Sequence, residues 1–275
     1  MILVLNLNAS VDRRYMLDTF EKGEVMRARS VENTAGGKGL HVANVLHALG
    51  ADAVTTGFLG GKAGEFIEER MAERGLAGDF THVADETRSC LAILTAAGEQ
   101  TEILEPGPMV TADELAAFRA KYRELLRGAN LVVGSGSIPQ GVPKSIYADL
   151  TGRRAETEED AQHAICALLD AGLPLACVSL GADGSLLGVA AETPDDPPQL
   201  YRVKVPHIDC KNPVGSGDSF VGGFAAALAS GKSPQEALRL AAACGTANAM
   251  EEESGSVTPE TVQALLPKIA ITKVS

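Results

Sequence analysis

The sequence predicts an α/β fold with a mostly parallel central sheet, flanking helices and a small β-ribbon lid. Short apolar runs typical of buried strands alternate with helical patterns along much of the chain. Glycine-rich turns follow several of these strands. Two extended ribbons, within about 13–34 and 87–105, interrupt the alternation. Such ribbons often cover the ligand edge of an α/β sheet, although an ordinary surface hairpin explains them equally well.

The first half of the chain supplies most of the predicted βαβ order. A capping box, Thr111 with Glu114, opens one helix, which Gly128 ends. The second ribbon reads as a hairpin that turns at 96–99. The expected elements are strands at 2–8, 53–60 and 130–137 and helices at 39–49, 64–74 and 111–128.

The second half continues with a helix at 157–172 and a buried strand at 175–181 that ends in a glycine loop. Two more strands follow at 185–190 and 199–205, separated by a turn rich in Pro and Asp. A long helix of small residues then begins after Ser233, with Pro234 at its first position and Glu236 completing a capping box.

Composition limits the class of protein. The 275 residues, 45% hydrophobic, suffice for one domain, 1–275, with a sizeable core. A net charge of −12 argues against nucleic acid or an anionic membrane as a partner, because both require a broad basic face. The five cysteines form no C-x-x-C pair, which favours reduced thiols and a cytoplasmic location. No apolar run approaches membrane-spanning length, and MILVLNLN reads as a first strand.

The stretch AGGKGLHVANVLHALG (35–50) places Gly36, Gly37 and Gly39 at a turn into a helix, with Lys38 among them. Glycines let backbone amides approach a ligand, and a helix N-terminus favours an anion or a sugar hydroxyl. The stretch matches neither the P-loop nor the dinucleotide fingerprint. Taken alone, it is better explained as a structural turn.

The stretch NPVGSGDSF (212–220) repeats this arrangement, with Gly215, Ser216 and Gly217 ahead of Asp218. An aspartate in a first helical turn commonly just complements the helix dipole. A carboxylate beside exposed amides also suits phosphoryl transfer, because the amides stabilise the transferred group and the carboxylate accepts the hydroxyl proton. Asp12, the turn at 36–39 and the loop at 179–184 also follow predicted strands, and such strand ends share one crevice in an open sheet. This conjunction favours the phosphoryl-transfer interpretation.

These motifs together resemble the ribokinase-like sugar kinases of the phosphofructokinase-B type, in the branch of 1-phosphofructokinase and tagatose-6-phosphate kinase. The resemblance spans nearly the whole chain. It rests on LNASVDRRYMLD, AGGKGLHVANVL, ETRSCLAIL with TEILEPGP, GSGSIPQGVP and NPVGSGDSFVGGF, in that order.

The resemblance implies a role for each site residue. Asp218 would be the catalytic base, and Gly215, Ser216 and Gly217 would form the anion hole. The sugar hydroxyls would be held by Asp12, Gly36 and Gly37, and the phosphate already on the substrate by Lys38, Arg27 and Arg88, although Arg27 reads almost equally well as a solvated charge. ATP would contact Ser179, Gly181, Gly184, Asn212 and Asn248, with Mg²⁺ held mainly by the phosphates.

Two departures from the family pattern stand out. His41 occupies a position where this branch usually has asparagine, so it either replaces that hydroxyl contact or packs on the helix. After Leu150 the chain also lacks about 30 residues, roughly one βαβ unit, that help organise Mg·ATP in the family. Removing such a unit from a parallel sheet would expose strand edges. We therefore expect the printed sequence to omit a segment between roughly Leu150 and Glu156.

The sequence thus predicts an ATP-dependent kinase that phosphorylates a hydroxyl of a ketohexose phosphate, either tagatose 6-phosphate or fructose 1-phosphate. One alternative is a kinase for an unphosphorylated sugar or a nucleoside. Another, tied to the missing segment, is a catalytically weak protein that binds sugar phosphates. Whether two chains pair through the lid as a homodimer is left open.

Overall fold

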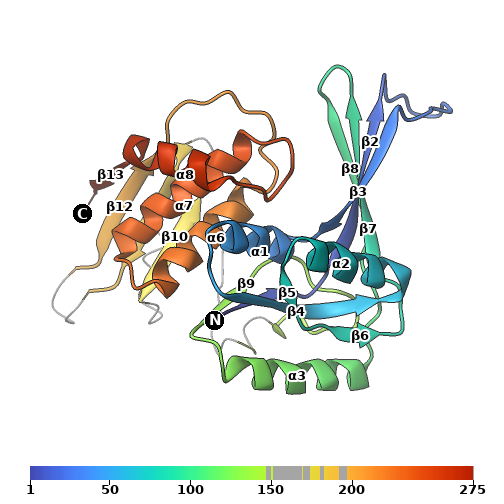
Figure 1. Cartoon of the computed structure of the whole chain (residues 1–275), viewed down its shortest axis with the longest axis horizontal. Coiled ribbons are helices and arrows are strands. Elements are labelled where there is room, and N and C mark those ends of the chain that lie inside the picture. The colour runs from blue at the N-terminus through green and yellow to red at the C-terminus, as the bar shows by residue number, and fades with distance from the viewer. Residues whose placement is uncertain (147–149, 151–168, 170–173, 180–182, 192–196, 275) are drawn as a thin grey trace. The chain divides into compact units, whose positions relative to one another are not determined.

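The computed structural model describes every residue except 147–149, 151–168, 170–173, 180–182, 192–196 and 275. The chain forms two compact units (Figure 1). The first comprises Met1–Ala43 and Ala53–Lys144, and the second Asn44–Asp52 and Ser145–Ser275. Residues of the predicted site occur in both units.

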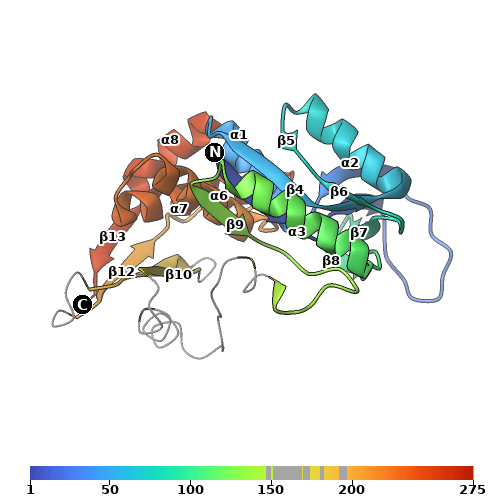
Figure 2. The ribbon, with the colours of Figure 1, turned by 90° about the horizontal axis from the view of Figure 1, so that it is seen from below.

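A parallel sheet forms the centre of the first unit. Its order is β5-β4-β1-β9, built from Ala77–Gly78, Ala53–Gly60, Ile2–Asn6 and Leu131–Gly134, and β6 (Thr81–Val83) also pairs with β4. Strand β1 is buried along its whole length because it pairs in parallel with β4 on one side and β9 on the other. Helix α2 (Gly61–Glu73) covers one face of this sheet and α3 (Ala112–Leu126) the other (Figures 1 and 2).

The lid is a second, four-stranded sheet that projects from the parallel sheet (Figure 1). Its order is β3-β2-β7-β8, from Ser30–Gly36, Ser10–Leu17, Arg88–Thr95 and Gln100–Leu104. Strand β2 pairs in parallel with β7 and antiparallel with β3, and β7 pairs antiparallel with β8. The hairpin turn closes with a hydrogen bond from Thr95 N to Glu99 O (3.0 Å). Both predicted ribbons therefore belong to one sheet.

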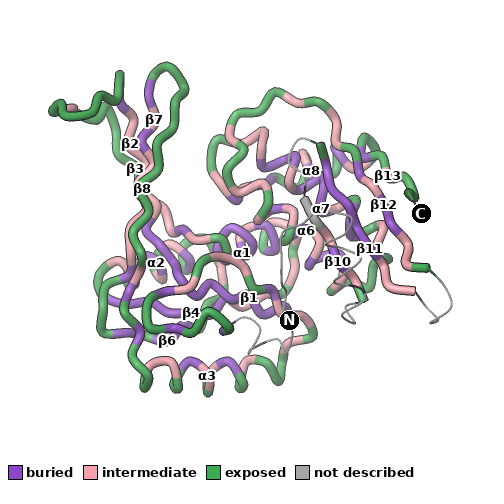
Figure 3. Tube along the Cα trace, turned by 180° about the vertical axis from the view of Figure 1, so that it is seen from behind, coloured by how far each residue is buried: buried purple, intermediate pink, exposed green. Residues whose placement is uncertain are grey.

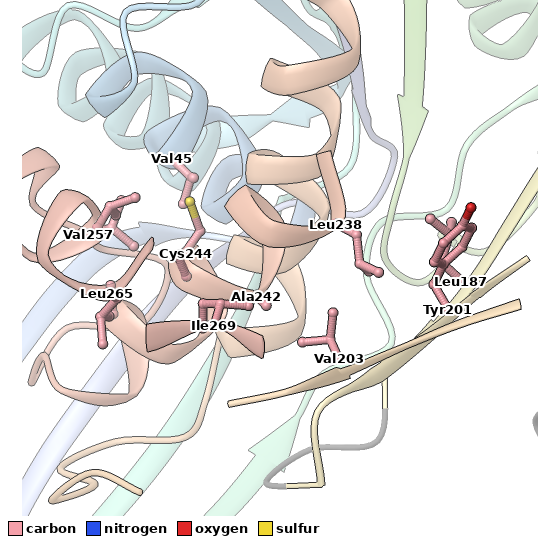
Figure 4. Packing of buried hydrophobic residues seen from close by; sticks show 13 residues of the cluster. Val45, Leu187, Tyr201, Val203, Leu238, Ala242, Cys244, Val257, Leu265 and Ile269 are labelled. Carbon is pink, nitrogen blue, oxygen red and sulfur yellow. The ribbon is translucent and has the colours of Figure 1, made fainter. Parts of the chain in front are cut away.

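The second unit packs three helices on an antiparallel sheet. The sheet order is β10-β11-β12-β13, from Leu175–Ser179, Ser185–Val189, Gln199–Lys204 and Ala270–Lys273. The helices are α6 (Ser216–Ala229), α7 (Pro234–Ala249) and α8 (Pro259–Leu265), and a 3₁₀ turn, η2 (Leu266–Lys268), follows. Leu238 and Cys244 of α7 pack with Leu187 and Val203 of the sheet in one buried cluster (Figure 4).

Most of the predicted elements are confirmed. Helix α1 (Lys38–Ala48), α2, α3 and α7 lie where the sequence places them, and both capping boxes form. The predicted parallel sheet is the central sheet of the first unit. The strand pairs described in the second unit are antiparallel. Helix α8 and strand β13 were not predicted, although Thr258 caps α8 and Pro259 stands at its first position. The helix expected at 157–172 lies outside the described residues.

Burial varies strongly between these elements. Strands β1 and β4 and helix α7 are largely buried, whereas β8 is exposed along its length (Figure 3). Over the part of the chain that the structure describes, no helix has the length and apolar character needed to cross a membrane.

Candidate active site

Asp12 lies in β2 against the first glycine turn. The Ser10 hydroxyl donates a hydrogen bond to Asp12 Oδ1 (2.7 Å). Gly36 lies so close to this carboxylate that any Cβ at that position would overlap it. Burial raises the pKa of Asp12, while the Ser10 hydrogen bond and the charges of His41 and Arg88 act in the opposite direction. The turn is thus shaped around a carboxylate that is partly withdrawn from water.

Asn6, at the end of β1, packs against the same glycine turn and hydrogen-bonds to it. Its Oδ1 accepts a hydrogen bond from Gly39 N (3.2 Å). A Cβ at Gly37 would lie 2.7 Å from Asn6 Oδ1, and a Cβ at Gly39 would lie 2.5 Å from Asn6 Cβ. Gly37 also has φ of +107°, which disfavours other residues. The glycines are therefore required by close packing as well as by backbone conformation.

His41 follows in the first turn of α1 and is buried. Its Nε2 lies 3.9 Å from Asp12 Oδ2, so the structure brings these two predicted substrate residues together. Lys38 is exposed at the start of α1. That Lys38 binds a phosphate stays a prediction, and so does the alternative that His41 contacts a sugar hydroxyl.

Arg88 connects the start of β7 to the segment between β1 and β2 and to the residue that follows β8. Its guanidinium donates to the carbonyl oxygens of Glu105 (2.9 Å) and Asn8 (3.2 Å). The side chain of Asn8 in turn donates to Ser137 Oγ (3.0 Å). Arg88 is thereby fixed at the base of the lid, beside Asp12. Arg27, by contrast, lies exposed between β2 and β3, outside this group of hydrogen-bonded residues.

Sequence reasoning missed several polar residues of this group. Asn6 and Asn8 are 2% and 5% exposed and interrupt the apolar sequence run at 2–8, and a buried amide within such a run is an available signal. Ser10 and Ser137 carry no comparable signal, because isolated serines are common in turns.

In the second unit, the second glycine stretch forms the N-terminus of α6. Gly215 is the N-cap residue, with φ of +84° in the left-handed region, and no side chain caps the helix. Gly217 is exposed, with open space where a Cβ would stand. Asp218 lies in the first turn and is half-buried. The predicted base and anion hole therefore lie together at an uncapped helix N-terminus, which suits a phosphoryl group.

Asn212 and Asn248 both contact this turn. Asn212 Oδ1 accepts from Val214 N (3.0 Å), and Asn248 Nδ2 donates to Val214 O (2.9 Å). That these asparagines also contact ATP stays a prediction.

The predicted nucleotide loop is described in part. Ser179 ends β10 and pairs with Ser185 of β11. Gly184 has φ of +89° and lies against the Val203 carbonyl oxygen, where a side chain would overlap it. Gly181 lies outside the described residues.

The residues present fit Mg·ATP through its phosphates. Among the described residues, no group of three or more His, Cys, Asp or Glu side chains could hold a metal ion. The N-terminus of α6 is uncapped, and open space surrounds Gly217, so this helix end suits a phosphate instead. A magnesium ion would then be held largely by the phosphates.

Comparisons with known proteins identify the family of the chain. Residues 5–154 and 147–261 match the family described as pfkB family carbohydrate kinase. The tagatose-6-phosphate kinase of Staphylococcus epidermidis strain RP62A is 32% identical over 318 aligned positions, which cover 100% of both chains.

Solved structures share the fold. Phosphofructokinase-2 from Escherichia coli, in complex with substrates and products, has a TM-score of 0.84 at 23% identity and covers 97% of this chain and 98% of its own. Ribokinase from Arabidopsis thaliana, with ribose and ATP, has a TM-score of 0.71 at 22% identity over 96% and 98%. At these identities the likeness concerns the fold. Because the family match covers most of the sequence, the chain belongs to the pfkB family of carbohydrate kinases.

Proposed function

We propose that the protein transfers the terminal phosphoryl group of ATP to a hydroxyl of a ketohexose phosphate and so forms a bisphosphate. The observation that carries the proposal is Asp218 in the first turn of α6, next to the open glycine turn. A base and an anion hole on one helix end are the two parts that phosphoryl transfer to an alcohol requires. The name of the S. epidermidis relative supports tagatose 6-phosphate as the substrate class.

Each group of residues has a separate task in this proposal. Asp218 accepts the proton of the attacking hydroxyl, and the amides at the start of α6 stabilise negative charge on the transferred group. Asp12 and the turn at Gly36 and Gly37 hold sugar hydroxyls. Arg88, with Lys38, binds the phosphate already on the substrate, because a fixed guanidinium favours a bidentate phosphate contact. Bound Mg·ATP supplies the phosphoryl group and neutralises charge on its oxygens.

The first test is a binding and turnover screen. Thermal shift is measured with tagatose 6-phosphate, fructose 1-phosphate and fructose 6-phosphate, with and without Mg·ATP, and ADP release is then followed for each. We expect one of these sugars to stabilise the protein and to drive ADP release. Asp218→Asn should reduce turnover by ~10²–10⁴-fold while leaving the ATP-induced thermal shift in place. Unchanged turnover in this variant would remove Asp218 from the role of base.

Two alternatives are separated by the same assays. For a kinase of unphosphorylated sugars, supported by the fold shared with ribokinase, neutral sugars should turn over best. Replacing Arg88 and Lys38 by methionine should then leave KM unchanged, whereas for a sugar phosphate it should raise KM strongly. A binding protein would show the thermal shift without ADP release that depends on Asp218.

We also propose that two chains pair through the lid. Tyr15, Ile93 and Val31 share one face of this sheet, since Tyr15 is in register with both other residues. Ile103, in register with Leu91, lies on the same face and is 51% exposed. Asp12 lies on the opposite face, with Cys90 and Leu104. Ile93 is buried, but Val31, 48% exposed, and Ile103 leave apolar surface on this face for a second copy, while the other face serves the sugar.

Finally, we propose that the natural chain carries a further segment between about 150 and 156, which lie outside the described residues except for Leu150. The family match supports this, because it falls into two parts that meet at 147–154. The alignment with the S. epidermidis relative is 318 positions long, whereas this chain has 275 residues. A cytoplasmic location also stays a prediction, supported by the free thiols of Cys90, Cys177, Cys210 and Cys244.

A further inference from the structure

We infer that Asn248 is a positioning residue that sets the shape of the anion-binding turn at Gly215–Gly217. The inference rests on the proposed function, in which that turn stabilises the transferred phosphoryl group. Asn248 lies near the end of α7 and is 0% exposed. A side chain so deeply buried can influence the turn through its hydrogen bonds to neighbouring residues.

The carboxamide of Asn248 makes four hydrogen bonds, all within the second unit. Oδ1 accepts from Gly255 N (2.7 Å) and from Ser219 Oγ (3.0 Å). Nδ2 donates to Val214 O (2.9 Å) and to Ser216 Oγ (3.2 Å). Two acceptor sites and two N–H groups are the full capacity of a carboxamide, so this buried group is completely satisfied.

These partners lie on both sides of Gly215. Val214 precedes it, Ser216 and Ser219 follow it, and a Cβ at Gly215 would lie 3.2 Å from Asn248 Oδ1. The amide therefore ties the residue before the left-handed position to the helix that begins after it. Holding these two ends fixes the direction in which the Gly217 N–H points, while the Ser216 N–H donates to Pro213 O (3.2 Å) and closes the turn. A preorganised donor needs no reorganisation when charge develops.

The orientation of the carboxamide follows from its partners. Gly255 N–H can only donate, and the Val214 carbonyl oxygen can only accept, so the oxygen of Asn248 must face Gly255 and its nitrogen must face Val214. Neither a hydroxyl nor a carboxylate reproduces this pattern. A carboxylate would also place a negative charge against a turn that is proposed to bind an anion.

Asn212 braces the outer side of the same turn. Its Nδ2 donates to Glu252 O (3.0 Å) and Ser254 Oγ (3.2 Å), while its Oδ1 accepts from Val214 N. The backbone of Lys211 donates to Ala249 O (2.8 Å), which directly follows Asn248. These hydrogen bonds therefore hold the segment that leads into the turn against the end of α7 and the residues after it. Asn248 is the most deeply buried of the residues that make these bonds.

The test separates positioning from simple loss of stability. Asn248→Ala is compared with Thr246→Ala on the same helix, whose buried hydroxyl donates only to Ala242 O among the bonds described. Both variants should lower Tm, but only Asn248→Ala should lower kcat, by ~10–10²-fold, with KM for the sugar phosphate within about twofold. Asn248→Asp, which keeps the volume, should lower kcat at least as much, and it replaces the alanine variant should that fail to fold.

Equal kcat in Asn248→Ala and Thr246→Ala at similar Tm would overturn the inference and leave Asn248 a purely structural residue. A parallel increase in KM for ATP and the sugar without a change in kcat would do the same. Asp218→Asn is measured beside them. If that variant keeps its turnover, the proposed function fails, whereas loss of turnover in Asp218→Asn together with an unchanged kcat in both Asn248 variants refutes only the positioning role.

Discussion

At the scale of single residues, Asp12 shows a conflict between stability and binding. Its carboxylate is partly buried by the glycine turn, and burial raises its pKa above the ordinary value of 3.8. A raised pKa means that the folded state holds this proton more tightly than the unfolded state does. The fold is therefore penalised once the pH rises through the pKa of the folded state, and the penalty vanishes below about the ordinary value.

Asp12→Asn should accordingly raise Tm at pH 7, by about 2 °C, because the side chain is 34% exposed and the penalty is correspondingly reduced. The difference in Tm should shrink as the pH is lowered toward 4, while sugar binding is lost at every pH. Thermal denaturation across this pH range measures both trends. Glu69→Gln, at an exposed position, is the control and should change Tm little at either pH. A lower Tm of Asp12→Asn at pH 7 would contradict the explanation.

Individual site residues could be predicted only where a motif marked them. The glycines at 36–39 and 215–217 and Asp218 stood out by their pattern, and the structure places them at helix N-termini as expected. The bracing asparagines carried a weaker signal. The family resemblance predicted that Asn248 contacts ATP. Nothing in the sequence shows that its side chain has four hydrogen-bond partners from separate segments of the second unit.

At the scale of elements, the close packing of α6 on α7 depends on small residues. A Cβ at Gly223 would lie 2.7 Å from Cys244 Sγ and 3.0 Å from Leu240 O. Cys244 is 0% exposed at this interface, and its burial raises the pKa of the thiol to about 12. The small-residue run after Asp218 thus has a packing reason that is independent of catalysis.

Gly223→Ala should destabilise the protein by about 1–3 kcal/mol, because the helices must separate or the Cys244 side chain must move. The matched control is Gly217→Ala on the same helix, where open space surrounds the new methyl group. That variant should leave stability unchanged or slightly raised, since alanine favours a helix, but should weaken ATP use by filling the phosphate turn. Urea denaturation and ADP release measure the two effects. Equal stability of both variants would show that α6 and α7 tolerate wider spacing.

At the scale of the whole molecule, the sequence predicts the elements better than their pairing. Apolar runs and capping boxes mark helices and strands locally, and these were confirmed. Which strands pair depends on contacts between distant segments, so the antiparallel sheet of the second unit and the joining of both ribbons into one lid sheet were visible only in the structure. Among the described strands, β9 pairs only with β1 and β10 only with β11, which leaves each at the edge of its sheet.

These edges give the last prediction its physical basis. An unpaired strand edge favours association between molecules, and a further βαβ unit would cover it. The test is a variant with an insert ahead of Glu156, made of the residues of the S. epidermidis relative that align after Leu150. Compared with the 275-residue chain, this variant should have a higher Tm and form less aggregate in light scattering. It should also show faster ADP release that depends on Asp218. An inserted stretch of Gly and Ser of the same length is the control, and it should reproduce none of these gains. If the printed chain is monodisperse and as active as the variant with the insert, these 275 residues form a complete catalytic unit without the segment.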